Sequence, residues 1–199
     1  MSKLYFRYGA MNSGKSTALL QVAYNYEERS QAVLLAKPFI DTKGGNTVVS
    51  RLGMTRAVDF TVGPTEDLRT LFAAARAEKL HATGLDTACL LIDESQFLTR
   101  SQVDQALEIA VTDGVPVLAY GIRTDFLTNS FPGSHRLFEL AHSIEELKTV
   151  CRCGRKAIFN ARIDNGVFIF EGSQVAIDGV DTSYESLCAG CYLKERDRS

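Results

Sequence analysis

The stretch that decides the fold is Gly9-Ala10-Met11-Asn12-Ser13-Gly14-Lys15-Ser16. An apolar run, Leu4 to Tyr8, precedes it and is typical of a buried strand, while a helical pattern over 17–29 follows it. A strand, a glycine loop and a helix in this order are the context of a phosphate-binding loop. Such a loop aims backbone N–H groups and a helix N-terminus at a triphosphate, with Lys15 on the β- and γ-phosphates and Ser16 on Mg²⁺. We therefore interpret residues 9–16 as an ATP-binding loop; the alternative is a glycine-rich turn that matches by chance.

The composition is that of a globular protein. The chain has 199 residues, of which 45% are hydrophobic, and this length fits one ordinary domain with a small appendage. The net charge of −2 and the lack of long basic runs argue against a general nucleic-acid binder. No apolar run approaches the roughly 20 residues of a membrane span, and the N-terminus lacks a signal-peptide pattern. We expect a cytoplasmic protein without membrane or nucleic-acid partners.

Strand-like and helix-like segments alternate up to about residue 149. Apolar runs of strand length occur at 32–36, 88–92 and 115–120, with a further strand candidate at 56–62. Apolar residues at helical spacing predict helices over 66–79, 99–112 and 137–140. Polar composition predicts loops at 39–50 and 121–134. The alternation is typical of an α/β fold, a parallel sheet with helices on both faces and all strands ending at one edge.

Two carboxylates, Asp93 and Glu94, follow the apolar run at 88–92. In proteins with a phosphate-binding loop, a carboxylate at this place lies opposite the loop and holds Mg²⁺ directly or through water. We predict that Asp93 and Ser16 share the Mg²⁺ that accompanies ATP. The alternative is that both carboxylates are a solvated strand end or the cap of the next helix.

The loop at 121–134 contains two aromatic residues, Phe126 and Phe131. Aromatic side chains in a loop at the end of a parallel strand are expected to be more exposed than core residues. They either anchor the loop or stack on a flat ligand. The residues alone leave both readings open.

Four of the five cysteines lie in the last quarter of the chain, as the pairs Cys151/Cys153 and Cys188/Cys191. Two close pairs can supply four thiolates to one tetrahedral zinc ion, which stabilises a segment too small to build its own core. Because four cysteines leave no coordination position open, we expect a structural zinc ion rather than a catalytic one. The alternative is a set of unconnected buried thiols.

The segment between the cysteine pairs has two recognisable features. Asn165-Gly166 predicts a hairpin turn between the apolar stretches 156–163 and 167–170. A polar, glycine-bearing loop over 177–184 follows and ends close to Cys188. A loop held at its base by zinc can close over a ligand.

Several motifs together resemble those of the type II thymidine kinases, and in particular their bacterial members. They are Leu-Tyr-Phe at 4–6, Ala-Met-Asn-Ser-Gly-Lys-Ser-Thr at 10–17, Asp-Glu-Ser-Gln-Phe-Leu-Thr-Arg at 93–100, Tyr-Gly-Ile-Arg-Thr-Asp-Phe at 120–126 and Glu-Leu-Lys-Thr-Val-Cys-Arg-Cys-Gly-Arg-Lys-Ala at 146–157. The phosphate-loop motif alone is shared by many families. Its combination with the other motifs is specific, and the resemblance extends almost from end to end.

The resemblance implies a P-loop (RecA-like) kinase domain over 1–149 and a zinc-binding domain with a lasso-type lid loop over 150–199. It implies transfer of the γ-phosphoryl group of ATP to the 5′-hydroxyl of thymidine, with deoxyuridine also accepted and Glu94 as the general base. A homotetramer and feedback inhibition by dTTP are further expectations of the family. The positions that match thymidine-binding residues are Met11, Asp41, Phe97, Ile122, Phe126, Phe131, Asn160, Val175 and Tyr184.

Two other functions fit the residues when the resemblance is set aside. A P-loop ATPase with a zinc module acting on nucleic acid would share the same motifs, since Glu94 could equally polarise water. The acidic balance and the lack of a basic stretch argue against it. A nucleotide-binding regulator without turnover is the other possibility, and Glu94 argues against that one.

Overall fold

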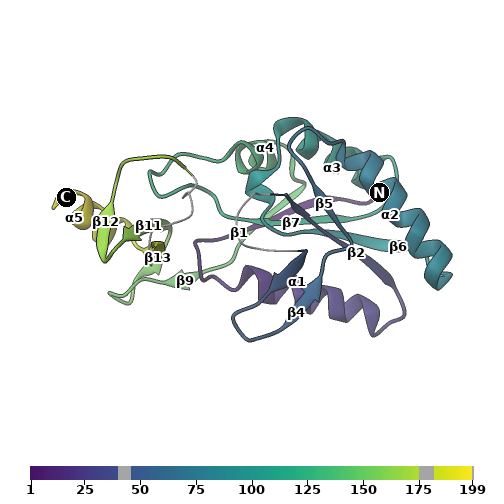
Figure 1. Cartoon of the computed structure of the whole chain (residues 1–199), viewed down its shortest axis with the longest axis horizontal. Helices are drawn as coiled ribbons and strands as arrows, with labels where there is room; N and C mark the ends of the chain where they lie inside the picture. Colours follow the sequence, from purple (N-terminus) through teal and green to yellow (C-terminus); the bar gives the residue numbers. More distant parts are fainter. Residues whose placement is uncertain (40–45, 175–181, 199) are drawn as a thin grey trace.

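The computed structural model describes residues 1–39, 46–174 and 182–198. Its largest element is a six-stranded parallel sheet (Figure 1). The strands are, in spatial order, β5 (Phe60–Val62), β2 (Ala32–Pro38), β6 (Thr87–Ile92), β7 (Val117–Gly121), β1 (Leu4–Tyr8) and β8 (Ser143–Glu146). Every neighbouring pair is parallel, so the carboxyl ends of all six strands lie at one edge, as the sequence predicts.

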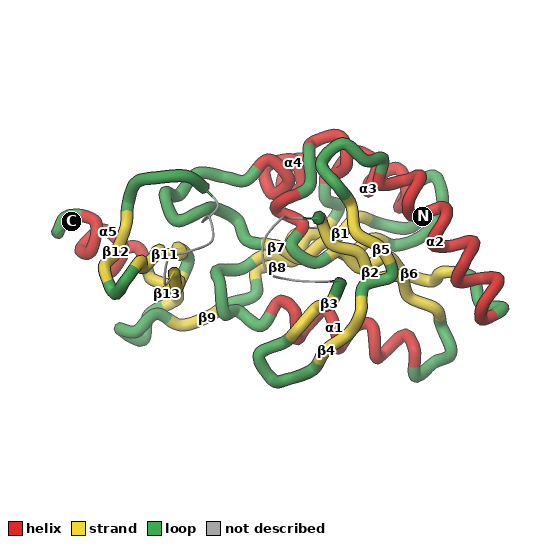
Figure 2. Tube along the Cα trace, viewed as in Figure 1, coloured by secondary structure: helices red, strands yellow, loops and turns green. Residues whose placement is uncertain are grey.

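Alternate side chains of the central strands face two separate cores. In β2, Leu34 and Ala36 join one core and Val33 and Leu35 join the other, because successive side chains of a strand point to opposite faces. The first core lies under α2 (Leu68–Thr83), α3 (Arg100–Val111) and α4 (Pro132–Leu140), and the second under α1 (Lys15–Glu27). Figure 2 shows α1 on one face of the sheet and the other three helices on the opposite face. The prediction of a parallel α/β sheet with helices on both faces is confirmed.

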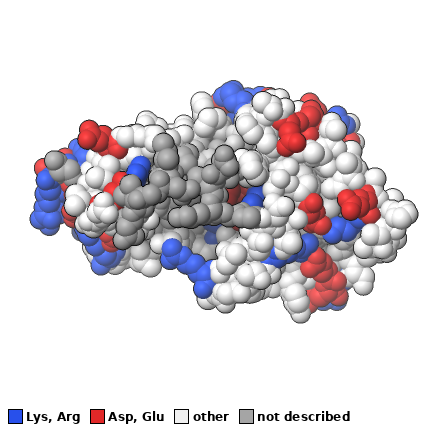
Figure 3. All heavy atoms as spheres, viewed as in Figure 1, with Lys and Arg blue, Asp and Glu red and all other residues white. Residues whose placement is uncertain are grey.

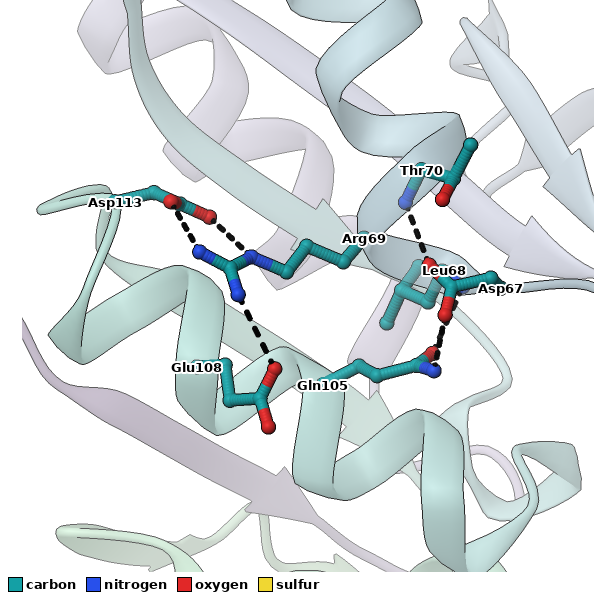
Figure 4. A network of polar contacts seen from close by, with 7 residues as sticks. All are labelled: Asp67, Leu68, Arg69, Thr70, Gln105, Glu108 and Asp113. Atoms are coloured by element: carbon teal, nitrogen blue, oxygen red, sulfur yellow. Dashed lines mark hydrogen bonds and ion pairs between the residues drawn. The ribbon is translucent and has the colours of Figure 1, made fainter.

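Polar side chains fix the two longest helices of the first face against each other (Figure 4). Asp67 caps α2, and Gln105 of α3 holds both the Asp67 carboxylate (2.6 Å) and the N–H of Leu68 (2.8 Å). The next residue of α2, Arg69, donates two hydrogen bonds to Asp113, just beyond the end of α3, at 2.8 and 3.1 Å. Two side chains joined by a pair of parallel hydrogen bonds have a defined geometry, so α2 and α3 cover this face as one layer.

The segment predicted as one strand over 56–62 is two strands. β4 (Thr55–Ala57) forms an antiparallel hairpin with β3 (Thr47–Val49), and only β5 joins the parallel sheet. The chain changes direction at Asp59, whose carboxylate accepts a hydrogen bond from the N–H of Leu35 (2.8 Å) and pairs with Lys79 (2.6 Å). Both partners are distant in sequence, so no local pattern reveals the break.

Two further segments differ from the prediction. The loop predicted over 39–50 contains β3 at residues 47–49, because Val48 is buried in the core under α1. The stretch 144–150, to which no element was assigned, contains most of β8 and all of β9 (Thr149–Val150). β8 adds the sixth strand beside β1.

The C-terminal part has its own core and small sheets. β11 (Phe159–Asp164) pairs with β12 (Val167–Ile169) and β13 (Thr182–Leu187), and β10 (Lys156–Ala157) pairs with β9. The predicted hairpin turn is confirmed, with positive φ angles of 50° at Asn165 and 81° at Gly166. β13 and α5 (Ala189–Arg196) were not predicted. The core residues of this part are Cys151, Ala157, Ala161, Leu187, Cys188 and Tyr192.

The surface carries mixed charge. On the face seen in Figure 3, the basic and acidic side chains of the described residues are interspersed. None of the helices in the described ranges combines the length and apolar character needed to cross a bilayer. The visible face therefore offers no broad basic surface to a polyanion.

Candidate active site

The loop between β1 and α1 is tightly bent, and two glycines permit the bend. A Cβ atom on Gly9 would lie 2.4 Å from the carbonyl oxygen of Leu147 and 2.4 Å from the Ser13 hydroxyl. Gly14 has φ 78° and Asn12 has φ 65°, both in the left-handed region. A side chain at either glycine would displace the loop or strain it.

Hydrogen bonds within the loop determine which of its amides remain available. The N–H of Met11 donates to Oδ1 of Asn160 (2.7 Å), and that of Ser13 to the carbonyl oxygen of Ala10 (3.3 Å). Within the described residues, the N–H of Ala10 makes no hydrogen bond, and neither do four N–H groups nearer to α1, namely those of Asn12, Gly14, Lys15 and Ser16. These four lie at the N-terminus of α1, where the helix dipole adds partial positive charge. This arrangement can bind an anion such as a phosphate group.

The Lys15 ammonium lies within this loop. Its Nζ donates to the carbonyl oxygen of Ala10 (3.0 Å). Burial lowers the pKa of Lys15, while the charges of Glu94 and Asp93 act in the opposite direction. The ammonium is thus held between the loop backbone and two carboxylates, where it can balance negative charge on a ligand.

The structure brings Asp93 and Ser16 together across the site. Asp93 follows β6 and is 5% exposed, and its Oδ2 lies 3.4 Å from the Ser16 hydroxyl, which donates to it. The other oxygen accepts the N–H of Glu94 (3.0 Å). Burial, and secondarily the Glu94 charge, raise the pKa of Asp93 to about 7. A carboxylate and a hydroxyl at this separation are suitable oxygen ligands for Mg²⁺.

Asp93→Asn should raise the stability of the ligand-free protein at alkaline pH. Because the folded-state pKa is raised from 3.8 to about 7, the contribution of the neutral acid to stability is complete below the unfolded pKa and is lost as pH rises through 7. We expect the variant to exceed the wild type by about 1–3 kcal/mol in free energy of unfolding at pH 8. The difference should vanish toward pH 4.

The measurement is urea unfolding at pH 4, 6 and 8 in the presence of a chelator and without nucleotide. A variant that is no more stable than the wild type at pH 8 would contradict this account of Asp93.

Glu94 is held in an unusual backbone conformation. It has φ 50° and ψ 36°, in the left-handed region, at the start of the short helix η1 (Ser95–Phe97). The Gln96 side-chain amide donates to the Glu94 carboxylate and accepts the N–H of Ile122 (3.2 Å). Gln96 therefore joins Glu94 to the loop that follows β7. Sequence reasoning missed Gln96, although it stands in the Asp-Glu-x-Gln-Phe motif.

The aromatic residues of the site are buried, which corrects the expectation that they are exposed. Phe126 and Phe131 are 1% and 3% exposed. The Phe131 ring packs edge-to-face on Phe97, with centroids 5.3 Å apart, and the Arg162 guanidinium lies 5.5 Å from the centre of the Phe126 ring. Both rings are thus shielded from solvent by the protein itself, and Phe131 packs against Phe97 of η1.

Asp125 organises this loop and was also missed. One carboxylate oxygen accepts the N–H groups of Leu127 (2.9 Å) and Asn129 (2.8 Å), and the other accepts the side-chain amide of Gln174 (3.0 Å). An aspartate that binds the backbone two residues ahead is a known turn device. Gln174 is the last described residue before the gap at 175–181.

The C-terminal part contributes two of the proposed thymidine-binding positions. Asn160 in β11 is 3% exposed and contacts the Gly9–Ser16 loop through Met11. Tyr184 was predicted on a closing loop but lies in β13, paired with Arg162 of β11. Two other positions of the predicted thymidine-binding set, Asp41 and Val175, lie outside the described residues.

The four clustered cysteines bring their sulfur atoms together. All four Sγ atoms of Cys151, Cys153, Cys188 and Cys191 lie within 4.8 Å of one another. Cys153 Sγ is 3.6 Å from that of Cys151 and 3.5 Å from that of Cys188, close to the roughly 3.8 Å that tetrahedral Zn–S geometry requires. The N–H of Cys191 helps lower the pKa of Cys188 to about 7, which favours the metal-binding thiolate. The cluster is compatible with zinc, and the reading as unconnected thiols is wrong.

The chain is similar to known proteins over nearly its whole length. The family model described as "Thymidine kinase" matches residues 2–192. The chain belongs to the thymidine kinase family. The thymidine kinase of Idiomarina loihiensis is 49% identical over 191 residues, which cover 94% of each chain. That of Legionella pneumophila (strain Lens) is 48% identical over 94% of this chain and 88% of its own, and that of Chromobacterium violaceum is 44% identical over 96% and 98%.

Membership of the thymidine kinase family confirms the resemblance drawn from the motifs, and it applies to nearly the whole chain. In this thymidine kinase family member, the carboxyl edge of the sheet gathers a loop with available amides, a half-buried lysine and two adjacent carboxylates. The packed rings of Phe97 and Phe131 follow in the same region, and the cysteine-bearing part contacts the loop through Asn160.

Proposed function

We propose that the protein is a thymidine kinase that transfers the γ-phosphoryl group of ATP to the 5′-hydroxyl of thymidine. The products are dTMP and ADP, the setting is nucleotide salvage, and deoxyuridine is also accepted. The observation that carries the proposal is the meeting of Asp93 and Glu94 with Lys15 and Ser16 at the end of β6. Family membership supplies the identity of the acceptor.

The donor half of the site is the Gly9–Ser16 loop, which we propose to be a P-loop of the RecA-like type. Its available amides bind the β- and γ-phosphates, and Lys15 neutralises charge on the group being transferred. Ser16 and Asp93 would hold Mg²⁺ with their oxygen atoms. Bound there, Mg²⁺ would neutralise negative charge on the phosphate groups.

The acceptor half of the site centres on Glu94, which we assign as general base. Its carboxylate takes the proton of the 5′-hydroxyl as the new bond to phosphorus forms. Gln96 holds this carboxylate in place by donating to it. The thymidine-binding set is Met11, Asp41, Phe97, Ile122, Phe126, Phe131, Asn160, Val175 and Tyr184.

The chain would divide into a kinase domain, 1–149, and a zinc-binding domain, 150–199, with a lasso-type lid loop. The separate core of the C-terminal part and its four-cysteine cluster support this division. The proposal further includes a cytoplasmic homotetramer that is inhibited by dTTP. It includes no nucleic-acid or membrane partner.

Release of ADP from ATP and Mg²⁺ should rise at least about tenfold when thymidine is added, since an oriented acceptor hydroxyl competes with water for the γ-phosphate. A coupled assay for ADP and chromatography for dTMP measure the two products, which should appear in equal amounts. Single-stranded DNA should leave the rate unchanged. Stimulation by DNA and not by thymidine would overturn the proposal in favour of a nucleic-acid-dependent ATPase, whose case rests on the shared loop and carboxylates.

A further inference from the structure

One residue of the Gly9–Ser16 loop, Met11, is held from both sides by the C-terminal part. Its N–H donates to Oδ1 of Asn160 (2.7 Å), and its carbonyl oxygen accepts the hydroxyl of Ser186. Asn160 in β11 and Ser186 in β13 stand directly opposite each other in the strand register. Both are buried, at 3% and 6% exposure. A cross-strand pair thus binds both backbone polar groups of a single loop residue.

The bond from Asn160 fixes more than Met11. In a trans peptide the N–H and the preceding C=O point in opposite directions, so directing the Met11 N–H toward Asn160 turns the Ala10 carbonyl the other way. That carbonyl accepts the Lys15 ammonium (3.0 Å) and the N–H of Ser13 (3.3 Å). Asn160 therefore sets the position of Lys15 through one peptide unit.

The bond from Ser186 acts in the same way on the next peptide unit. The Met11 carbonyl points toward Ser186, so the N–H of Asn12 in the same unit points away from β13. Asn12 itself has φ 65°, a conformation that persists only where its surroundings enforce it. Ser186 thus aims one of the available amides and supports the left-handed turn that follows.

Asn160 also reaches the second loop of the site. Its Nδ2 donates to the carbonyl oxygen of Thr124 (3.3 Å), so its oxygen and one N–H are both engaged. The amide joins three parts of the site: β11, the Gly9–Ser16 loop and the loop that carries Phe126. Because Ser186 lies two residues before Cys188, the β11–β13 pair connects the cysteine cluster directly to the Met11 backbone.

We propose that Asn160 and Ser186 are positioning residues for the nucleotide: the cysteine-bearing part sets the conformation of the Gly9–Ser16 loop through Met11. This deepens, and rests on, the proposed function. It assigns to Asn160 a role in ATP binding that is separate from any contact with thymidine. An ordered C-terminal part is then required for the donor half of the site as well as for the acceptor half.

Binding of ADP with Mg²⁺, measured by calorimetry without thymidine, tests the proposal. Asn160→Ala and Ser186→Ala should each weaken ADP binding about tenfold, the usual effect of leaving a buried backbone group without its partner. Ser186→Thr, which keeps the hydroxyl, should restore most of the affinity. Asn25→Ala on α1 and Ser143→Ala on β8 are matched controls at exposed positions and should bind ADP like the wild type.

Hydrogen exchange of the peptide covering residues 9–16 provides a second measurement, and it should be faster in both alanine variants than in the controls. Circular dichroism and metal content identify any variant that fails to fold. If one alanine variant fails to fold, the ADP affinity of the other tests the proposal. ADP affinities within twofold of wild type in folded alanine variants would overturn the proposal. Wild-type protein that binds ADP but does not phosphorylate thymidine would instead overturn the proposed function. The positioning role of Asn160 and Ser186 would then still stand.

Discussion

Replacing Glu94 by glutamine should lower kcat for thymidine phosphorylation by about 10²- to 10⁴-fold, the range expected for loss of a general base. The substitution keeps the size of the side chain and removes its ability to accept a proton. Lys15, Ser16 and the loop amides are untouched, so ADP affinity should stay within about twofold of wild type. Rapid quench measurement of dTMP formation and calorimetry with ADP separate these two quantities.

The control for this substitution is Glu78→Gln, on the exposed surface of α2. It removes a carboxylate of the same kind far from the reaction and should retain full activity. Loss of ADP binding in Glu94→Gln would refute the assignment, because it would place Glu94 in the donor half of the site. A fall in kcat of less than tenfold would show that the hydroxyl proton leaves by another route.

Replacing Cys188 and Cys191 together by serine should release zinc and unfold the C-terminal part. Among the described residues of this part, six form its buried core, and a core of this size is small for an independent domain of about 50 residues. Structural zinc contributes apparent binding free energies of about 10–16 kcal/mol in small domains, so folding of such a segment depends on the metal. Thymidine binding should fall at least about 100-fold, since the segment that we propose to cover the acceptor would lose its order.

Three measurements test the expected loss of zinc, of order and of thymidine binding. They are metal content by mass spectrometry, the rate of tryptic cleavage within 150–198, and thymidine affinity. ADP binding should weaken as well, through Met11. Cys89→Ala is the control, because Cys89 is buried in the core under α1 and remote from the cluster; it should keep one zinc ion per chain. A doubly substituted protein with wild-type thymidine affinity would exclude a structural role for the cluster.

The parts of the fold that follow from local pattern could be predicted. The runs at 32–36 and 88–92 are apolar because both faces of their strands are covered. A continuous apolar run of this length is enough to identify such a strand in the sequence. The bend at 9–16 could be predicted because a strand-like run precedes its two glycines and a helical pattern follows them. Thr99 could be placed at a helix start because its capping box with Gln102 is a local signal.

The remaining features depend on partners distant in sequence. Asp59 divides a predicted strand because of its contacts with Leu35 and Lys79. Gln96 acquires its role from Glu94 together with the distant backbone of Ile122, and Asn160 from the distant backbones of Met11 and Thr124. Short elements such as β13 and α5 have weak patterns of their own, and they lie on either side of Cys188, one of the four clustered cysteines.

The position of β1 also has a consequence for the order of assembly. β1 is inserted between β7 and β8, with Leu4 opposite Val117 and Tyr5 opposite Ser143. Contacts that span more than 100 residues form late, since a long loop must close before they gain stability. The Gly9–Ser16 loop is synthesised before β7 and β8, so its supporting strand has no neighbour on either side until those two strands have followed. The nascent chain therefore carries the segment that we propose to bind nucleotide long before the sheet that supports this segment is complete.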